Sequence, residues 1–325
     1  MKTSLPNALC KFAAIAVATS LYAPVSAQIS TNRPVRLIVG SAPGGPSDVQ
    51  ARLLVPKMGE VLGTTIIVDN RASSNGILGM EIASKAPSDG HTFAVGNSGT
   101  HAVNATLYKT LPYDPVRDFT PVTQFSTTGM VVAATGKLPG TSIQDLANFA
   151  KTRKGGLSIA IPGATGELAG DALWKQLGVR MTNVQYKGSS PSELAVISGE
   201  ADVSLLTPLA SASHIQTGRM KAYGITSATR SPILPDVPTL AEQGVTGYDI
   251  QFWNGLFAPA KTPEAAVRAA HKAVVAALQT AEVRERFRQL GLQTVGNTPE
   301  EFRAIVNRDV EKFRKIIVDS GIPRL

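Results

Sequence analysis

The segment Val35–Asp48 contains the residue pattern that most directly suggests binding chemistry. An apolar stretch leads to Gly44 and Gly45, and a polar helix start follows, with Ser47 as the expected N-cap and Gln50 as its capping-box partner. The glycines let backbone N–H groups approach a ligand, and the helix N-terminus behind them supplies unpaired donors and partial positive charge. The pattern predicts a site for a carboxylate or phosphate without a lysine, and an ordinary strand-to-helix turn is the structural alternative.

Three further loops of small polar residues follow apolar strand-like runs. They are Gly96–His101, Pro162–Glu167 and Tyr186–Pro191. In open α/β sheets, ligands bind outside the carboxyl ends of the strands, so these loops and the first one are expected to converge on one small polar ligand. Glycine, serine and threonine are also ordinary turn residues, which leaves a purely structural role open for each loop.

Catalytic and metal-binding patterns are hard to find in this sequence. The four histidines do not have a metal-ligand spacing, and neither a G-x-S-x-G elbow nor a Walker pattern is present. We therefore expect no catalytic residue, no cofactor and no metal. The local pair Ser98 and His101 leaves a hydrolase that uses the same loops as the alternative class.

The N-terminus has the features of a secretory signal peptide. Lys2 and Lys11 supply positive charge, the apolar run Phe12–Tyr22 is shorter than the roughly 20 residues of a membrane span, and small residues precede a cleavage point after Ala27. We expect residues 1–27 to be removed and the mature chain to be exported and soluble, with no membrane insertion.

Charge and cysteine usage narrow the class of partner. Cys10 is the only cysteine, so the mature chain would contain no disulfide. It would rely on core burial, which in a chain of this length is expected to be divided over two lobes. The formal net charge is +8, to which Lys2 and Lys11 contribute two charges. The basic residues are scattered, which indicates mild attraction to anions or simple solubility, and no nucleic-acid binding.

Apolar runs alternate with amphipathic helices through most of the chain, which predicts an α/β fold with largely parallel sheets. Near the C-terminus, Thr262 is the expected N-cap of one helix, with Pro263 at its first position, and Thr298–Glu301 predicts a second start with a capping box. Gly291 is typical of a helix end. The expected strands are Arg36–Gly40, Thr65–Asp69, Thr92–Gly96, Met130–Ala133, Leu157–Ile161, Val184–Tyr186 and Val203–Leu206.

The chain resembles the periplasmic solute receptors of tripartite tricarboxylate transporters, the Bug or TctC-type receptors, over nearly its whole mature length. The match is specific because many motifs occur in order. They are Arg33–Leu54, Val68–Gly79, Ala86–Asn104, Leu107–Thr123, Val184–Pro191, Leu234–Asp249 and Trp253–Pro263.

This resemblance implies a type II periplasmic binding protein with two α/β lobes, a hinge and a ligand cleft between the lobes. Domain 1 would contain residues 28–125 and 252–325, and domain 2 would contain residues 126–251. The function implied is a monomeric, non-enzymatic periplasmic receptor that captures a small organic carboxylate by cleft closure. It would deliver this ligand to permease subunits in the membrane. A sensor domain that reports to a membrane kinase is a further alternative with the same fold.

The resemblance also implies a set of ligand-binding residues. In domain 1 these are Ala42, Pro43, Gly44 and Gly45, with Ser47 and Asp48 at the helix start, and then Asn97, Ser98, Thr100 and His101. In domain 2 they are Gly163, Ala164, Thr165, Gly166, Glu167, Lys187, Gly188, Ser189, Asp202 and Thr207.

Glu167 departs from the family pattern, which often has a histidine at this place. A carboxylate that faces the cleft would repel a second ligand carboxylate and favour a ligand with an ammonium or a hydrogen-bond donor at its far end. Alternatively, Glu167 is a solvated acid that stabilises the first turn of its own helix.

Overall fold

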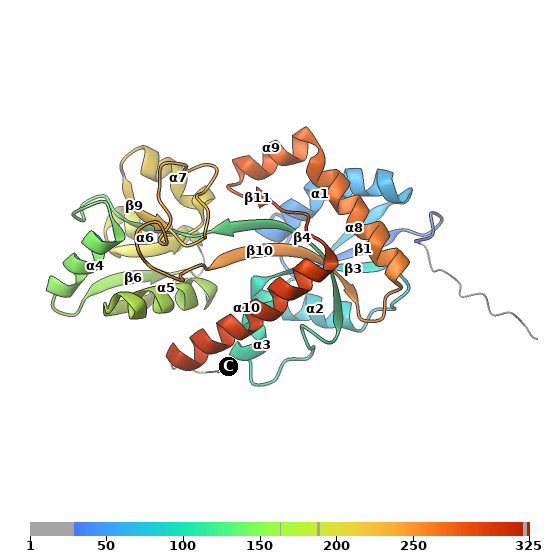
Figure 1. The fold of residues 1–325 in the computed structure, drawn as a ribbon, viewed down its shortest axis with the longest axis horizontal. Coiled ribbons are helices and arrows are strands. Elements are labelled where there is room, and N and C mark those ends of the chain that lie inside the picture. Colours follow the sequence, from blue (N-terminus) through green and yellow to red (C-terminus); the bar gives the residue numbers. More distant parts are fainter. Residues whose placement is uncertain (1–28, 163, 187–188, 321–323) are drawn as a thin grey trace, which may run out of the picture.

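Two mixed β-sheets organise the chain, one in each of two lobes (Figure 1). The computed structural model describes residues 29–162, 164–186, 189–320 and 324–325. The predicted signal peptide and the candidate site residues Gly163, Lys187 and Gly188 lie outside the described residues.

The six-stranded sheet of the first lobe combines segments from both ends of the chain. The strand β1 pairs in parallel with β2 and β3, whereas β10 runs antiparallel to β3 and β4. In spatial order the strands are β11 (Gln293–Thr294), β4 (Phe119–Gly129), β10 (Gln251–Pro259), β3 (Thr92–Asn97), β1 (Val35–Val39) and β2 (Ile66–Asn70).

The five-stranded sheet of the second lobe lies within the stretch between β4 and β10. The strand β6 is parallel to β7 and β8, and β5 is antiparallel to β8 and β9. The order is β7 (Met181–Gln185), β6 (Leu157–Ile161), β8 (Val203–Leu206), β5 (Val131–Thr135) and β9 (Met220–Ile225). The expectation of largely parallel sheets is therefore wrong for β4, β5, β9, β10 and β11. The strands β4 and β10 run in opposite directions because one leaves the first lobe and the other returns to it.

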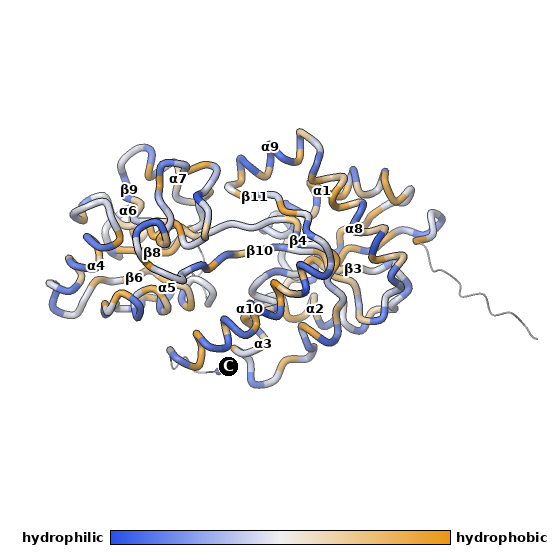
Figure 2. The backbone as a smooth tube through the Cα atoms, in the orientation of Figure 1, coloured by the Kyte–Doolittle hydropathy of each residue, from blue (hydrophilic) through white to orange (hydrophobic). Residues whose placement is uncertain are grey.

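Helices cover both sheets, and α10 extends from the first lobe to the second (Figure 1), where it packs against α5. Hydrophobic and hydrophilic residues alternate along α10 (Figure 2). Its hydrophobic residues, among them Phe302 and Phe313, belong to a core cluster that includes residues of both lobes, such as Trp174 of α5. The helices are α1 (Pro46–Leu62), α2 (Ile77–Ser84), α3 (Asn104–Leu107), α4 (Ile143–Thr152), α5 (Ala164–Leu177), α6 (Ser189–Ser198), α7 (Pro208–Gln216), α8 (Glu264–Gln279), α9 (Ala281–Gln289) and α10 (Pro299–Ser320), with the short turns η1 (Ser74–Gly76) and η2 (Gly99–Val103).

The passage between the lobes consists of two neighbouring strands. The strand β4 belongs to the first sheet as far as Gly129, and β5 belongs to the second from Val131. On the return, the N–H of Ile250 donates to the Thr226 carbonyl just before β10 begins. Beside this passage, Trp253 is buried and its indole Nε1 donates to Asp309 Oδ2 at 2.8 Å, so its side chain belongs to the core.

The first helix does not begin as the sequence predicted. Its N-cap is Gly45 and Pro46 occupies the first turn, where the fixed φ of proline suits a helix start. Ser47 is therefore inside the helix, and its hydroxyl donates to Asn254 Oδ1 at 2.7 Å, while Gln50 accepts from Ser126 instead of closing a capping box. The prediction of a Ser47 cap is wrong because Pro46 already begins the helix.

Two of the three predictions for helix ends near the C-terminus are confirmed, and the third is shifted by one residue. The capping box at the start of α10 is present, since Glu301 N–H donates to Thr298 Oγ1 and Thr298 N–H donates to Glu301 Oε2. Gly291 follows α9 with a positive φ of 69°, as expected for a helix end. The start of α8 is shifted by one residue, because its N-cap is Pro263 rather than Thr262.

Candidate functional site

Two adjoining cavities lie between the lobes and together form what we call the cleft. Their volumes are about 570 Å³ and about 500 Å³. We call the larger one the polar cavity; its lining includes Ala42, Ser73, Asn75, Thr100 and Asn104. We call the smaller one the apolar cavity; its lining includes Val49, Leu209, Phe252, Leu290 and Leu292. The residues that line both are Ser41, Ser47, Asn97, Gly99 and Thr165.

Three helices begin at this cleft. Ser47 is in the first turn of α1, Thr165 is in the first turn of α5, and Thr207 caps α7 by accepting from Ala210 N–H. Helix N-termini combine unpaired N–H groups with partial positive charge. None of the described residues that line either cavity has a charged side chain. The cleft therefore attracts an anion through oriented backbone dipoles.

Asp48 holds the loop that leads into α1. This carboxylate is 2 % exposed and accepts from Gly44 N–H at 2.8 Å, from Asn70 Nδ2 at 2.9 Å and from Arg52 Nε at 3.0 Å. Burial alone would raise the pKa of Asp48, but these hydrogen bonds and the Arg52 charge outweigh it and hold the pKa below 3.8. Asp48 is thus a positioning residue beneath the loop.

The two glycine N–H groups that the sequence suggested as ligand donors are used inside the loop. Gly44 donates to Asp48, and Gly45 donates to the Ala42 carbonyl at 3.0 Å. Gly44 has a φ of 80°, which favours glycine, and a Cβ on Gly45 would lie 3.2 Å from Ser41 Oγ. The glycines therefore shape the loop, and the ligand donors must come from other groups.

Ser41 is a candidate donor that sequence reasoning missed. Its Oγ is buried without a hydrogen-bond partner among the described residues, and the residue lines both cavities. A buried hydroxyl without a partner costs free energy, and a ligand oxygen in the cleft would supply the missing bond. The available signal was its position just after β1, ahead of the glycines.

The variant Ser41→Ala is expected to lower ligand affinity without lowering the stability of the ligand-free protein. We expect ligand affinity to fall about tenfold, the value of one lost hydrogen bond, while the melting temperature of the ligand-free protein stays level or rises. The matched variant Ser47→Ala should instead lower the melting temperature, because it leaves Asn254 without its donor. Thermal unfolding and calorimetric titration measure the two effects. Equal affinity of Ser41→Ala and wild type would contradict a ligand role for Ser41.

The loop after β3 is closed by two reciprocal hydrogen bonds. Asn97 N–H donates to Thr100 Oγ1 and Thr100 N–H donates to Asn97 Oδ1, both at 2.9 Å. This arrangement leaves the amide nitrogen of Asn97, which lines both cavities, able to donate to a ligand. Ser98 borders the apolar cavity.

His101 points away from the cleft and into the core of the first lobe. Its ring stacks on Phe257 with centroids 3.8 Å apart and meets Phe119 edge-on, and burial lowers the pKa of His101 to about 3. Nδ1 lies 2.9 Å from Thr100 Oγ1 rather than at Ser98. This neutral, fully buried histidine lines neither cavity and is not positioned as the base of a Ser98 nucleophile.

The second lobe contributes Thr165 to both cavities and Thr207 to the apolar one. Glu167 lines neither, and its carboxylate accepts from Gln185 Nε2 at 3.0 Å. Asp202 precedes β8 and accepts from Ser158 N–H and Oγ, so it lies at the opposite end of that strand from Thr207. The structure does not bring Asp202 to the cleft.

Comparison with known proteins identifies the family. The model of the tripartite tricarboxylate transporter family receptor matches residues 50–322. The chain belongs to this receptor family. A protein from the tcbD–tcbE intergenic region of Pseudomonas sp. strain P51 is 34% identical over 309 residues, which cover 94% of this chain and 92% of the relative. Bordetella pertussis BugT is 29% identical over 311 residues, which cover 94% of this chain and 95% of BugT.

Solved structures show that this receptor has the two-lobe periplasmic binding protein fold. Rhodopseudomonas palustris Rpa4515 with adipate superposes with a TM-score of 0.78 at 32% identity, covering 90% of this chain and 99% of that one. MatC from the same organism with bound malate has a TM-score of 0.73 at 31% identity, covering 88% and 99%. The fold class and the family inferred from the sequence motifs are confirmed.

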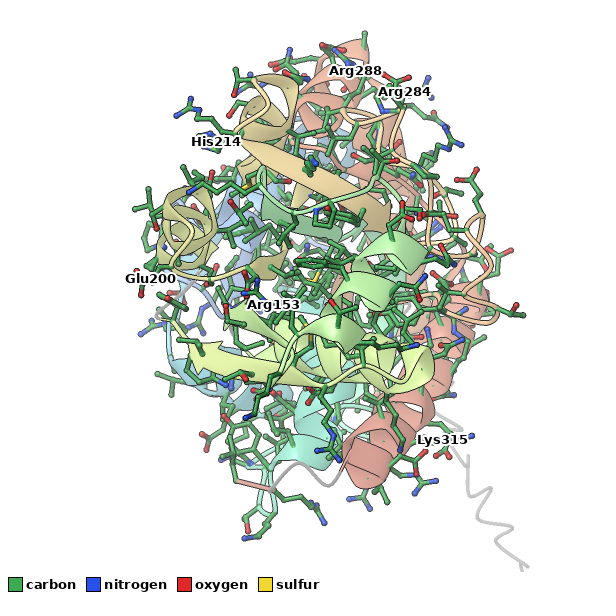
Figure 3. All side chains as sticks on the ribbon, turned by 90° about the vertical axis from the view of Figure 1, so that its left-hand side faces the viewer. Arg153, Glu200, His214, Arg284, Arg288 and Lys315 are labelled. Atoms are coloured by element: carbon green, nitrogen blue, oxygen red, sulfur yellow. The ribbon has the colours of Figure 1, made fainter. Side chains whose placement is uncertain are left out.

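Outside the cleft, the described residues also line a cavity of about 750 Å³ beside α5 and α10, which borders Lys175, Lys312 and Asp319. In the described part of the chain, no helix has the length and apolarity to cross a membrane, and no group of three or more His, Cys, Asp or Glu residues is arranged to hold a metal ion. Charged side chains occur on several elements, and Figure 3 shows Arg284 and Arg288 together on α9 and Lys315 on α10. The cleft is thus the best candidate for the functional site.

Proposed function

We propose that this receptor captures a small organic carboxylate in the cleft by closing its lobes on it, and presents the closed form to the permease of a tripartite tricarboxylate-type transporter. The observation that carries the proposal is the buried Ser41 Oγ, which has no hydrogen-bond partner among the described residues and lies at a cleft where three helices begin. Charge-assisted hydrogen bonds from preorganised donors would provide the affinity.

The relatives support this assignment by their ligands. MatC was solved with malate and Rpa4515 with adipate, and both cover nearly all of this chain's described fold. Carboxylate recognition is also consistent with an uncharged cleft, because a helix N-terminus stabilises an anion without a basic side chain.

The movement proposed is a rotation of one lobe relative to the other. Residues 28–125 with 252–325 would form one domain and residues 126–251 the other, with β4 and β10 as the hinge between them. The receptor would act as a monomer in the periplasm after cleavage of its signal peptide behind Ala27.

The position of His101 supports a receptor without enzymatic activity. The neutral His101 faces Thr100 and the aromatic core, so Ser98 has no base within the loop. The ligand would therefore leave the cleft chemically unchanged.

A thermal-shift screen of the mature protein against mono-, di- and tricarboxylates, amino acids and aromatic acids tests the proposal. A ligand that binds the folded state raises the melting temperature by mass action, and we expect at least one carboxylate to do so and to be recovered intact. Consumption of the ligand would favour the enzyme. The absence of any carboxylate hit would contradict the proposed ligand class.

A further inference from the structure

The apolar cavity is lined by hydrophobic side chains that would make no favourable contact with a small polar anion. Val49, Phe252, Leu290 and Leu292 come from the first lobe, and Pro208 and Leu209 come from the second. Leu209, in the first turn of α7, is 52% exposed even though it borders this cavity. An apolar group that entered here would contact side chains of both lobes and remove Leu209 from water.

The apolar cavity shares its polar edge with the neighbouring cavity. Ser41, Asn97 and Thr165 line both, so a carboxylate bound to them lies at the entrance to the apolar walls. Apart from the helix starts at Ser47 and Thr207, the described lining of the apolar cavity offers a second carboxylate no charged partner. Moving a charge into such surroundings without a partner is costly, whereas moving a hydrocarbon there is favourable.

From these contacts we infer that the ligand is a monocarboxylate with an apolar tail, whose carboxylate binds at the shared edge and whose tail occupies the apolar cavity. This inference rests on the proposed function and specifies its ligand. A volume of about 500 Å³ lies in the range of small-molecule sites. Because the walls come from both lobes, the tail also stabilises the closed form.

Side chains of the protein itself could fill the apolar cavity in place of a ligand tail. If Leu209 packs against Leu290 when the lobes close, the apolar cavity disappears and a tail gains nothing. The two cases differ in how affinity depends on tail length. Burying one methylene corresponds to about fourfold tighter binding, whereas a filled cavity gives a flat or falling series.

Calorimetric titration of the whole mature chain tests the inference, with straight-chain monocarboxylates from acetate to octanoate and dicarboxylates from malonate to suberate. We expect the monocarboxylates to bind about fourfold more tightly for each added methylene until the cavity is full. The dicarboxylates of equal length should bind more weakly than the monocarboxylates.

Matched variants assign the effect to this cavity. Leu209→Gln should weaken the longer monocarboxylates about tenfold and leave acetate unchanged, and Leu209→Met should preserve the length dependence. The control is Leu194→Gln, which alters another exposed leucine of the second lobe that lines neither cavity and should change neither ligand.

The outcomes separate this inference from the proposed function. Carboxylate binding with a flat length series, with tighter dicarboxylates, or with an unchanged series in Leu209→Gln overturns the apolar-tail ligand and leaves the receptor function standing. Failure of every carboxylate to bind overturns the proposed function itself.

Discussion

Replacing His101 with leucine is expected to remove much of the protein's sensitivity to acid between pH 6.5 and about 3. Burial lowers the pKa of His101 from 6.5 to about 3, so in this range the unfolded chain binds a proton that the folded protein does not. The free energy of unfolding therefore decreases as the pH falls, by up to about 1.4 kcal/mol per pH unit. Between pH 6.5 and pH 5 this single group costs about 2 kcal/mol.

Urea unfolding at pH 7 and pH 5 measures the effect in wild type and His101→Leu. Leucine keeps an apolar group against Phe257, and Thr100 Oγ1 retains its bond to the Asn97 carbonyl at 3.1 Å. The control is His271→Leu, on the half-buried side of α8, in which the loss between the two pH values should persist because His101 is still present. A His101→Leu protein that loses as much stability as wild type would show that other groups cause the acid sensitivity.

Strands buried on both faces were predictable from the sequence. Leu157–Ile161 and Val203–Leu206 were predicted with their observed bounds, because predominantly apolar runs on the inner strands of a sheet are recognised without a period of two. The strand β4 was missed since Phe119–Gly129 is rich in threonine and serine. Several of these hydroxyls bond to other segments, such as Thr128 to the Gly291 carbonyl and Ser126 to Gln50. Such a strand resembles a loop until its partners are known.

The site was predictable in outline because topology brings the carboxyl ends of parallel strands together. Gly44, Thr165 and Thr207 follow β1, β6 and β8, Asn97 ends β3, and all four line the cleft. The part played by each residue as a ligand contact stays a prediction.

Which polar groups remain available was not predictable from the sequence. The N–H of Gly44 donates to Asp48, and within the described ranges the Oγ of Ser41 has no hydrogen-bond partner. The direction of His101 depends on the short turn η2, which turns its ring toward Phe257. These outcomes depend on contacts between residues that are far apart in the chain or on the pitch of a single turn.

Asp48→Ala is expected to lower the free energy of unfolding by about 3 kcal/mol and to weaken carboxylate binding at least about tenfold. The change removes a buried acceptor and leaves Gly44 N–H without its partner. Asn70 Nδ2 keeps its bond to the Ser41 carbonyl and Arg52 keeps its bond to Asn70 Oδ1, but both lose Asp48, so the loop beside Ser41 loses part of its support. Urea unfolding and calorimetric titration of the same preparations measure both quantities. The control is Glu60→Ala on the same helix. Its exposed carboxylate forms a surface ion pair with Lys57, so the change should affect neither quantity noticeably.

The pH dependence of the Asp48→Ala deficit identifies its cause. The folded-state pKa of Asp48 lies below 3.8, so the stabilisation is fully present above that pH and is lost as the pH falls through the folded-state value. The difference in unfolding free energy between wild type and Asp48→Ala should therefore be constant from pH 8 to pH 5 and shrink below pH 3.8. A deficit that persists undiminished at lower pH would mean that the lost packing volume, and not the ionised carboxylate, stabilises the loop. In that case the weakened ligand binding would have to be explained by a collapse of the loop into the space that Asp48 occupied.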